Sequence, residues 1–268
     1  MLHEHNLVFE LIKTCDHLCI KYIKFLLRFV MSQLCYQLAS HGVVVAAVEH
    51  RDGSGGGSHY ILREEGLSMS NSVPHKPVPT DDNEYKVRNE QLSHRSGEIS
   101  RVIDLLAKLN AGEFVENVVD PNCDLTGIKG NLDMTHNLFL LGHSFGGSSV
   151  ILAASQDPRV KTVLTLDPWM FPASEQKFSI TAPTTVINSG KFLNENNVNV
   201  IKRAANDESI VKFRVMKSGV HLSPTDVPCI FPHLLIRKGL GLMDKIDPKV
   251  VMKEVNQVVL EWVQEACY

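Results

Sequence analysis

The sequence predicts an α/β fold, with a mostly parallel sheet and helices on both faces. Three observations support this prediction. Apolar runs of strand length alternate with helix-compatible segments, an order typical of parallel sheets. One of these runs, Asn137 to Leu141, leads into Gly142-His143-Ser144-Phe145-Gly146-Gly147, and the helix-compatible run Ser148 to Ala154 follows. Gly-x-Ser-x-Gly between a strand and a helix is the pattern of a nucleophile elbow, a sharp turn that raises a serine above the end of the sheet.

The size and composition of the chain suit one large globular domain. Of its 268 residues, 44% are hydrophobic and 21% are charged, which are ordinary values for such a domain. The formal net charge of −3 gives no reason to expect nucleic acid as a partner. The six cysteines have no zinc-like or redox-like spacing, and no Asn-x-Ser/Thr acceptor is present. We therefore expect an intracellular, cytoplasmic protein without a metal site.

The N-terminal segment, residues 1–31, is treated apart from the main domain, residues 32–268. Lys21, Lys24 and Arg28 interrupt the apolar stretch Leu18 to Met31, and they share one face if the stretch is helical. These charges exclude a membrane-spanning helix, which needs about 20 nearly uncharged residues, and they do not suit a signal peptide. We expect a basic amphipathic helix that packs on the domain or lies on a membrane surface, unless the segment is foreign to the domain.

Upstream of the elbow, the sequence predicts a helix, a strand and a second helix. The first helix ends at Gly42, a residue type typical of the position after a helix. The strand is apolar throughout, as expected when both of its faces are buried. Three prolines make the stretch Ser68 to Asp82 an irregular excursion. In chain order, the expected elements are the helix Ser32 to His41, the strand Val43 to Val48, and an amphipathic helix from near Glu84 to Gly112.

Downstream of the elbow, strands and helices continue to alternate. Asp167-Pro168 closes the first of these strands. The last helix has Asp247 as its cap and Pro248 at its first position, and an apolar stripe at helical spacing follows. We expect strands at 160–166, 184–188 and 211–216, a helix at 198–205, and a final helix from 248 onward.

Ser144 is the candidate nucleophile, and it needs a base and an acid. In this architecture the chain order is serine, acid, histidine. Asp167 stands at a strand end and suits the acid, although an Asp-Pro turn cap accounts for its position equally well. His221 follows the last strand and suits the base better than His233, which lies in an apolar setting. Asp226 is an alternative acid, five residues after His221.

An oxyanion hole needs two donors. The backbone N–H of Phe145, next to the nucleophile, suits the first. The second normally comes from a glycine-rich loop after an earlier strand, and we identify no such strand and loop before Val43. His143, inside the elbow, is interpreted as a packing or orienting residue.

Two other motifs are weaker. His50-Arg51-Asp52 resembles a kinase catalytic loop, but Gly57 stands where that motif needs asparagine. The glycine-rich stretch Gly53 to Ser58 lacks the Lys-Ser/Thr ending of a phosphate-binding loop. We interpret the first as a salt-bridged strand end and the second as a loop.

Beyond these motifs, the sequence resembles a known family. Three stretches carry the resemblance: Leu38 to Asp52, the elbow Gly142 to Gly147, and Leu166-Asp167-Pro168-Trp169-Met170-Phe171-Pro172. Ile187-Asn188-Ser189 and Gly219-Val220-His221 continue it. Together they are similar to the platelet-activating factor acetylhydrolases of the plasma and cytosolic type II group, from about residue 33 to the C-terminus.

The resemblance implies an α/β-hydrolase catalytic domain over residues 32–268, without calcium or another cofactor. It implies a serine esterase that removes acetyl and short or oxidised acyl groups from the sn-2 position of phospholipids, at a membrane or lipoprotein surface. It assigns Ser144, Asp167 and His221 the roles of nucleophile, acid and base, with Trp169, Met170 and Phe171 as apolar residues near the site.

The sequence departs from the family at its front. Residues 1–31 bear no similarity to the family's early strand and His-Gly-Leu-Gly-type loop, which supplies the second oxyanion donor. We therefore expect early strands of the sheet to be missing or replaced. The alternative to an active esterase is a catalytically impaired fragment that keeps the triad and lacks this donor. A membrane-binding module that uses the basic N-terminal helix is a third hypothesis.

Overall fold

The structure is a computed structural model. It describes residues 9–12, 17–23, 31–55, 58–64, 67–81, 83–117, 122–207, 210–216, 219–230 and 246–267. For residues 9–12, 17–23, 59–64, 67–70 and 267 only the backbone is described.

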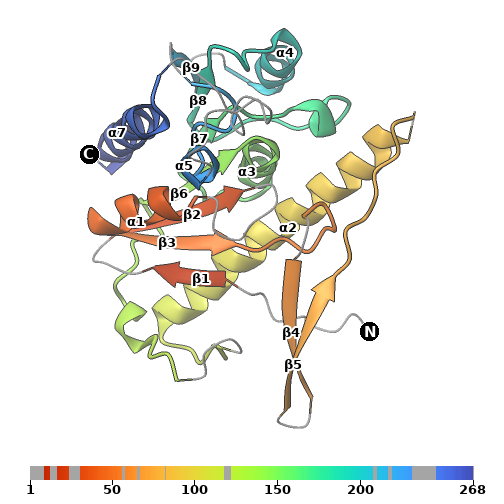
Figure 1. Ribbon diagram of the computed structural model, residues 1–268. Helices are drawn as coiled ribbons and strands as arrows, with labels where there is room; N and C mark the ends of the chain where they lie inside the picture. Colours follow the sequence, from red (N-terminus) through yellow and green to blue (C-terminus); the bar gives the residue numbers. More distant parts are fainter. Residues whose placement is uncertain are drawn as a thin grey trace.

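A seven-stranded sheet forms the centre of the molecule (Figure 1). Its strand order is β1-β3-β2-β6-β7-β8-β9, and only β1 runs antiparallel to its neighbour. The mostly parallel sheet predicted from the sequence is therefore confirmed. The strands are β1 Phe9–Ile12, β2 His17–Ile23, β3 Val43–Val48, β6 Leu138–His143, β7 Thr162–Leu166, β8 Thr184–Ser189 and β9 Val211–Met216.

Helices cover both faces of the sheet. Alternate strand residues point to opposite faces, which gives two hydrophobic clusters. Helices α2 (Glu84–Ala111), α3 (Phe145–Gln156) and α4 (Glu195–Ala204) contribute to one cluster. Helices α1 (Ser32–Ser40) and α7 (Pro248–Cys267) contribute to the other.

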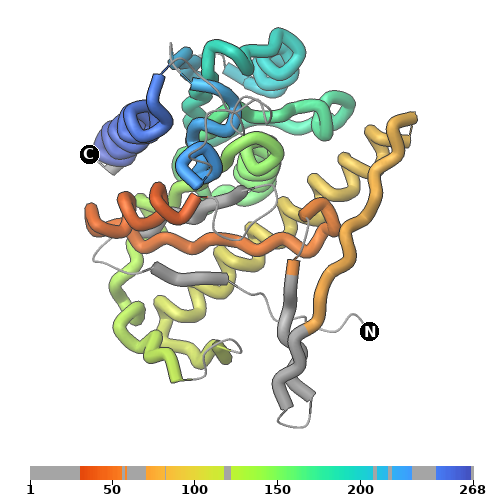
Figure 2. The backbone as a smooth tube through the Cα atoms, viewed as in Figure 1, coloured from red at the N-terminus to blue at the C-terminus, as the bar shows by residue number. Residues whose placement is uncertain are grey.

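Short elements complete the described chain. Strands β4 (Ser58–Glu64) and β5 (Leu67–Val73) form a separate antiparallel pair, so part of the expected irregular excursion is a strand. The 3-10 turn η1 (Thr126–Ile128) precedes β6, η2 (Phe171–Ala173) follows β7, and α5 (Val227–Ile230) follows β9. Figure 2 traces the chain through these elements in sequence order.

The N-terminal expectations need correction. Residues 17–23 form strand β2 and are not part of a helix, and residues 24–30 lie outside the described residues. The strand pairs with β3 on one side and with β6 on the other, and this pairing overrides the helical spacing of the charges. Two strands therefore precede Val43, and the expectation that early strands are missing is wrong for β1 and β2.

Other expected elements agree with the structure to within a few residues. Helix α4 begins at Glu195, three positions before the expected start, because the side chain of Asn194 accepts a hydrogen bond from the Asn196 N–H at 2.8 Å. Gly112 ends α2 with a φ of 80°.

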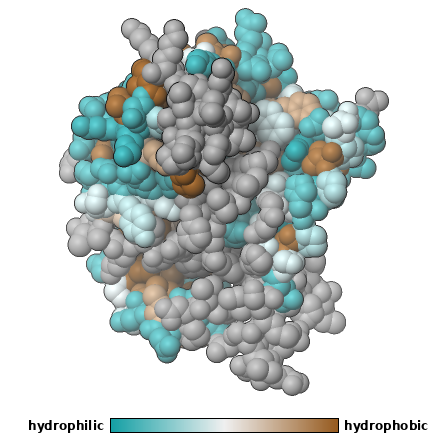
Figure 3. Space-filling model, in the orientation of Figure 1, coloured by the Kyte–Doolittle hydropathy of each residue, from teal (hydrophilic) through white to brown (hydrophobic). Residues whose placement is uncertain are grey.

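Within the described residues, no helix is both long and apolar enough to cross a bilayer. On the face drawn in Figure 3, the described surface is largely hydrophilic, and its hydrophobic patches are small and separate.

Candidate active site

Ser144 lies at the turn between β6 and α3. Its backbone has a φ of 56° and a ψ of −123°, a strained conformation for a residue other than glycine. The turn needs a glycine at position 142, because a Cβ atom there would lie 2.3 Å from the carbonyl oxygen of Gly146. This close crossing of strand and helix raises the Ser144 side chain above the end of β6.

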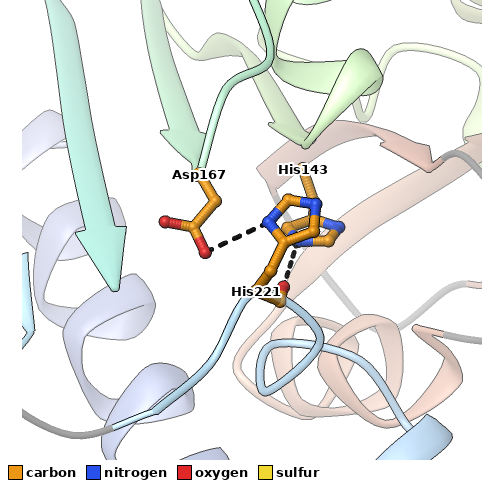
Figure 4. Close-up of side chains that lie close together, drawn as sticks. All are labelled: His143, Asp167 and His221. Atoms are coloured by element: carbon orange, nitrogen blue, oxygen red, sulfur yellow. Dashed lines mark hydrogen bonds and ion pairs between the residues drawn. The ribbon is translucent and has the colours of Figure 1, made fainter. Parts of the chain in front are cut away.

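Three side chains form a connected row at this turn. The Nε2 atom of His221 lies 2.9 Å from the Oγ atom of Ser144. The Nδ1 atom of the same ring lies 3.4 Å from Oδ2 of Asp167. Figure 4 shows the Asp167 side chain pointing at the His221 ring. The structure thus brings together the serine, histidine and aspartate that the sequence analysis selected.

Asp167 is fixed by Ser189, a residue to which the sequence assigned no role. The residue is 1% exposed, and its carboxylate accepts two hydrogen bonds from Ser189. The backbone N–H of Ser189 donates to Oδ1 at 2.6 Å, and its hydroxyl donates to Oδ2 at 2.7 Å. Asp167 also has a positive φ of 47°, which turns the chain sharply at the end of β7. A serine at the last position of a strand carries no sequence signal for this role.

The topology explains why residues so far apart in sequence meet. Ser144 follows β6, Asp167 follows β7, Ser189 ends β8, and His221 follows β9. These four strands are consecutive and parallel, so their carboxyl ends lie along the same edge of the sheet.

The alternatives to these residues are located elsewhere or not described. Asp226 accepts a hydrogen bond from the backbone N–H of Gln33 at 3.3 Å, at the start of α1. The carboxylate that faces His221 is that of Asp167. His233 lies outside the described residues, as does Gly57.

Two rings enclose His221. Phe192 is stacked on its imidazole, with the ring centroids 3.8 Å apart and the planes at 15°. His143 packs at a centroid distance of 4.7 Å, and its Nε2 atom lies 2.7 Å from the backbone carbonyl oxygen of His221. His143 is 1% exposed, which agrees with a packing or orienting role. Phe192 was not selected from the sequence, because no local pattern sets this loop residue apart from the other apolar residues of the chain.

The backbone N–H of Phe145 belongs to the first residue of α3, directly after Ser144. The ring of Phe145 is buried and meets Trp169 edge-on at a centroid distance of 5.4 Å. The Arg95 guanidinium lies over the Phe145 ring, 4.2 Å from its centroid. Strand β2 ends at Ile23 beside His143, and residues 24–30, which follow it, lie outside the described residues.

A buried ionic network lies beyond Phe145, between the end of β3 and α2. Arg95 pairs with Asp52, and Glu98 pairs with His50 and Arg51. His50-Arg51-Asp52 is thus a salt-bridged strand end, as the sequence suggested. Burial lowers the pKa of His50 from 6.5 to about 4, although Glu98 opposes this. Burial raises the pKa of the Glu98 carboxyl, but His50 and His94 outweigh burial and hold it well below its usual range.

Within the described residues, His143, Asp167 and His221 form a group whose ligand-type atoms lie within 4.8 Å of one another. Such spacing also occurs at metal sites. Here hydrogen bonds engage both ring nitrogens of His221, one with Ser144 and one with Asp167. The arrangement therefore suits proton transfer between a serine and an imidazole.

The fold and this site define an α/β-hydrolase: an elbow serine, with an acid and a histidine at later strand ends of a mostly parallel sheet. A ferulic acid esterase from Streptomyces cinnamoneus has a similar fold, with a TM-score of 0.65 and 19% sequence identity. The similarity covers 94% of this chain and 68% of the esterase chain.

The chain belongs to the platelet-activating factor acetylhydrolase family. Residues 26–267 match the family described as platelet-activating factor acetylhydrolase, isoform II. The platelet-activating factor acetylhydrolases of Cavia porcellus and Bos taurus are 34% and 31% identical to it, over 89% of this chain. A putative phospholipase A2 of Schizosaccharomyces pombe is 25% identical. The chain spans about half the length of the two acetylhydrolases, 54% in each case.

Proposed function

We propose that the chain is a serine esterase that hydrolyses the sn-2 acetyl or short acyl ester of phospholipids, with Ser144 as nucleophile, His221 as base and Asp167 as acid. The observation that carries the proposal is the hydrogen-bonded row of these side chains, with 2.9 Å between Ser144 Oγ and His221 Nε2. Family membership supplies the class of substrate.

The chemistry follows from the geometry. Ser144 Oγ attacks the ester carbonyl carbon while His221 Nε2 takes the hydroxyl proton. Asp167 orients the imidazole through Nδ1 and stabilises its charged form. The N–H of Phe145 donates to the oxyanion that develops on the carbonyl oxygen. The imidazolium then gives its proton to the departing lysophospholipid alcohol, and an acyl-serine remains.

Water completes the cycle. His221 removes a proton from a water molecule, which attacks the acyl-serine carbonyl. A second tetrahedral intermediate collapses, the proton returns to Ser144 Oγ, and acetate leaves. The net reaction is ester plus water to acid plus alcohol.

A fluorophosphonate probe tests the proposal most directly, because labelling needs both an activated serine and oxyanion stabilisation. We expect labelling of the wild-type chain, loss of labelling in Ser144→Ala, and acetate release from a 2-acetyl phospholipid. Ser155→Ala is the matched control, because this hydroxyl donates to the Leu152 carbonyl at 2.7 Å near the far end of α3. A folded wild-type chain that is neither labelled nor active supports the impaired fragment.

Exposed apolar residues at the edge of the sheet that carries Ser144, Asp167 and His221 support contact with a lipid surface. Phe171 follows β7 and is 37% exposed, and Leu193 follows β8 and is 52% exposed. We expect Leu193→Ser to weaken binding to phosphatidylcholine vesicles in a flotation assay. Val250→Ser, on α7, is the control at a similarly exposed apolar residue. Equal binding by all three proteins contradicts a role for this edge.

We also propose a cytoplasmic location. Cys123 is an exposed free thiol, which suits a reducing compartment. Fractionation of cells that express the chain tests this, and recovery from the secreted fraction contradicts it.

A further inference from the structure

One side chain of the buried ionic network reaches the elbow. The guanidinium of Arg95 lies over the Phe145 ring, 4.2 Å from the ring centroid, and the two residues are 2% and 0% exposed. Arg95 belongs to α2, which packs against α3 and β3 (Figure 1). A buried cation thus rests on the residue that directly follows the nucleophile, and the mechanism proposed above gives it no role.

Groups from the chain after β3 fix the position of this guanidinium. The Nε atom of Arg95 pairs with Oδ2 of Asp52, and its Nη2 atom donates to Oδ1 of the same carboxylate at 3.4 Å and to the hydroxyl of Ser54. The Asp52 side chain is fully buried, and it accepts the backbone N–H and the hydroxyl of Ser54 at 3.0 Å and 2.9 Å. Arg95 therefore presents a fixed cation to the Phe145 ring.

Stability alone is a weak explanation for the pair of Arg95 and Asp52. Removing two charges from water costs free energy, and well-packed apolar side chains of similar volume often replace a buried ion pair without loss of stability. The contact with Phe145 gives the pair a different purpose. A cation within about 6 Å of an aromatic centroid is attracted to the ring face, and the attraction is stronger in a site without water. The contact therefore restricts the movement of the Phe145 ring.

The elbow needs such restriction because its backbone is strained. Ser144 has a φ of 56°, and a strained conformation persists only where the surrounding structure fixes it. The carbonyl oxygen of Ser144 is fixed by the backbone N–H of Trp169, which donates to it at 2.9 Å. The next residue, Phe145, is fixed through its ring, which contacts Arg95 on its face and Trp169 edge-on.

We propose that Arg95, held by Asp52, is a positioning residue of the oxyanion hole: it fixes the Phe145 ring and thereby the direction of the Phe145 backbone N–H. This inference rests on the proposed esterase, in which that N–H donates to the oxyanion. A donor that is already aimed before the substrate arrives needs no reorganisation in the transition state. Because Arg95 acts through this donor, its effect falls on the transition state and leaves binding of the ester unchanged.

The test uses the double variant Asp52→Asn/Arg95→Met, because R95M alone leaves a buried carboxylate without its partner. We expect kcat for p-nitrophenyl acetate to fall about tenfold with KM nearly unchanged, a smaller loss than removal of a whole oxyanion donor causes. The inhibition constant of a trifluoromethyl ketone, whose adduct with Ser144 carries an oxyanion, should rise by the same factor. Arg95→Lys should recover part of kcat, since an ammonium is also attracted to an aromatic face.

A double-mutant cycle separates this role from a general loss of structure. Phe145→Leu keeps the backbone N–H and removes the ring, so D52N/R95M should change kcat less than about twofold when F145L is also present. The matched control is His50→Gln/Glu98→Gln, which removes the neighbouring buried pair, leaves Arg95 and Asp52 in place, and should keep the wild-type kcat. Equal losses with and without the Phe145 ring, or a wild-type kcat in folded D52N/R95M, overturn the assignment.

Trp169 reports on the same contact without turnover. The chain has two tryptophans, so Trp262→Phe leaves Trp169 as the single emitting indole. We expect D52N/R95M to shift its emission through the Phe145 ring that it contacts, and H50Q/E98Q to leave the emission unchanged. If the emission shifts but the wild-type chain hydrolyses no ester, the esterase fails and the contact that fixes Phe145 stands. If the wild-type chain hydrolyses esters and D52N/R95M changes neither emission nor kcat, the positioning role fails alone.

Discussion

His143 holds the backbone of His221: its Nε2 atom lies 2.7 Å from the His221 carbonyl oxygen, and the two rings pack with centroids 4.7 Å apart (Figure 4). Because a carbonyl oxygen only accepts, Nε2 of His143 carries the proton in this hydrogen bond. The residue before the nucleophile thus positions the residue that serves as its base.

Replacing His143 with Phe keeps a ring at this position and removes the donor. We expect kcat for p-nitrophenyl acetate to fall about tenfold with KM nearly unchanged, since one hydrogen bond contributes about 1 kcal/mol. His143→Gln, which retains an N–H donor, should recover part of the loss. A folded H143F protein with wild-type kcat would contradict the positioning role.

Ser189→Ala removes one of the two hydrogen bonds that hold Asp167 and leaves the backbone N–H bond in place. The carboxylate should then be less well oriented toward His221, and we expect kcat to fall about tenfold, the effect of roughly 1 to 2 kcal/mol. Ser189→Thr keeps the hydroxyl and serves as the matched control. Equal activity of the alanine and threonine variants would show that the backbone N–H suffices.

Gly147 lies where α3 approaches the chain after Asp167. A Cβ atom at position 147 would lie 2.8 Å from Pro168 Cα, so Gly147→Ala must push this segment away from Ser144. We expect the variant to lose about 1 to 3 kcal/mol of unfolding free energy and most of its activity.

The control for this variant is Gly97→Ala in the interior of α2, where the nearest atom to a new Cβ is Arg101 Nη1 at 3.5 Å. Alanine favours helix, so G97A should keep its activity and gain up to about 1 kcal/mol in a urea titration. Similar losses in both variants would mean that the crowding at Pro168 is not the cause.

The buried network predicts how stability depends on pH. The folded-state pKa of His50 is about 4, below its ordinary value of 6.5, and the groups around it are Glu98, Arg51, Arg95 and Asp52. Between these two values the unfolded chain binds a proton that the folded chain does not. Stability is therefore fully present above pH 6.5 and is lost as the pH falls toward 4, by roughly 3 kcal/mol.

The depressed pKa values of Glu98 and Asp52 act in the same direction below their ordinary values near 4. Urea titrations at pH 7.5, 6 and 5 check the prediction. His50→Gln should flatten the pH dependence, whereas His75→Gln, at an exposed position, should not. A wild-type chain equally stable at pH 7.5 and pH 5 would contradict it.

Local sequence patterns predicted well where the strands end. They predicted poorly which residues from neighbouring strands meet at those ends. Asp167 and His221 were selected because chain order and strand endings constrain where an acid and a base can stand. Ser189 and Phe192 were not, because only the parallel pairing of β7, β8 and β9 brings their loops to the triad. The charges of residues 18–31 share one face of a helix by coincidence, and β2 forms because two strands flank it.

The place of β2 has a consequence for how the chain folds as it leaves the ribosome. This strand is synthesised well before one of its two hydrogen-bonding partners, β6, which ends at His143, beside the nucleophile. All residues from Ile23 to Leu138 must leave the ribosome before β6 can pair with β2. The centre of the sheet therefore forms through contacts of long sequence separation. Folding should therefore be slow, and nascent chains that end before β6 should depend on chaperones. Chaperone binding to ribosome-stalled chains of increasing length would show whether this dependence ends once β6 has emerged.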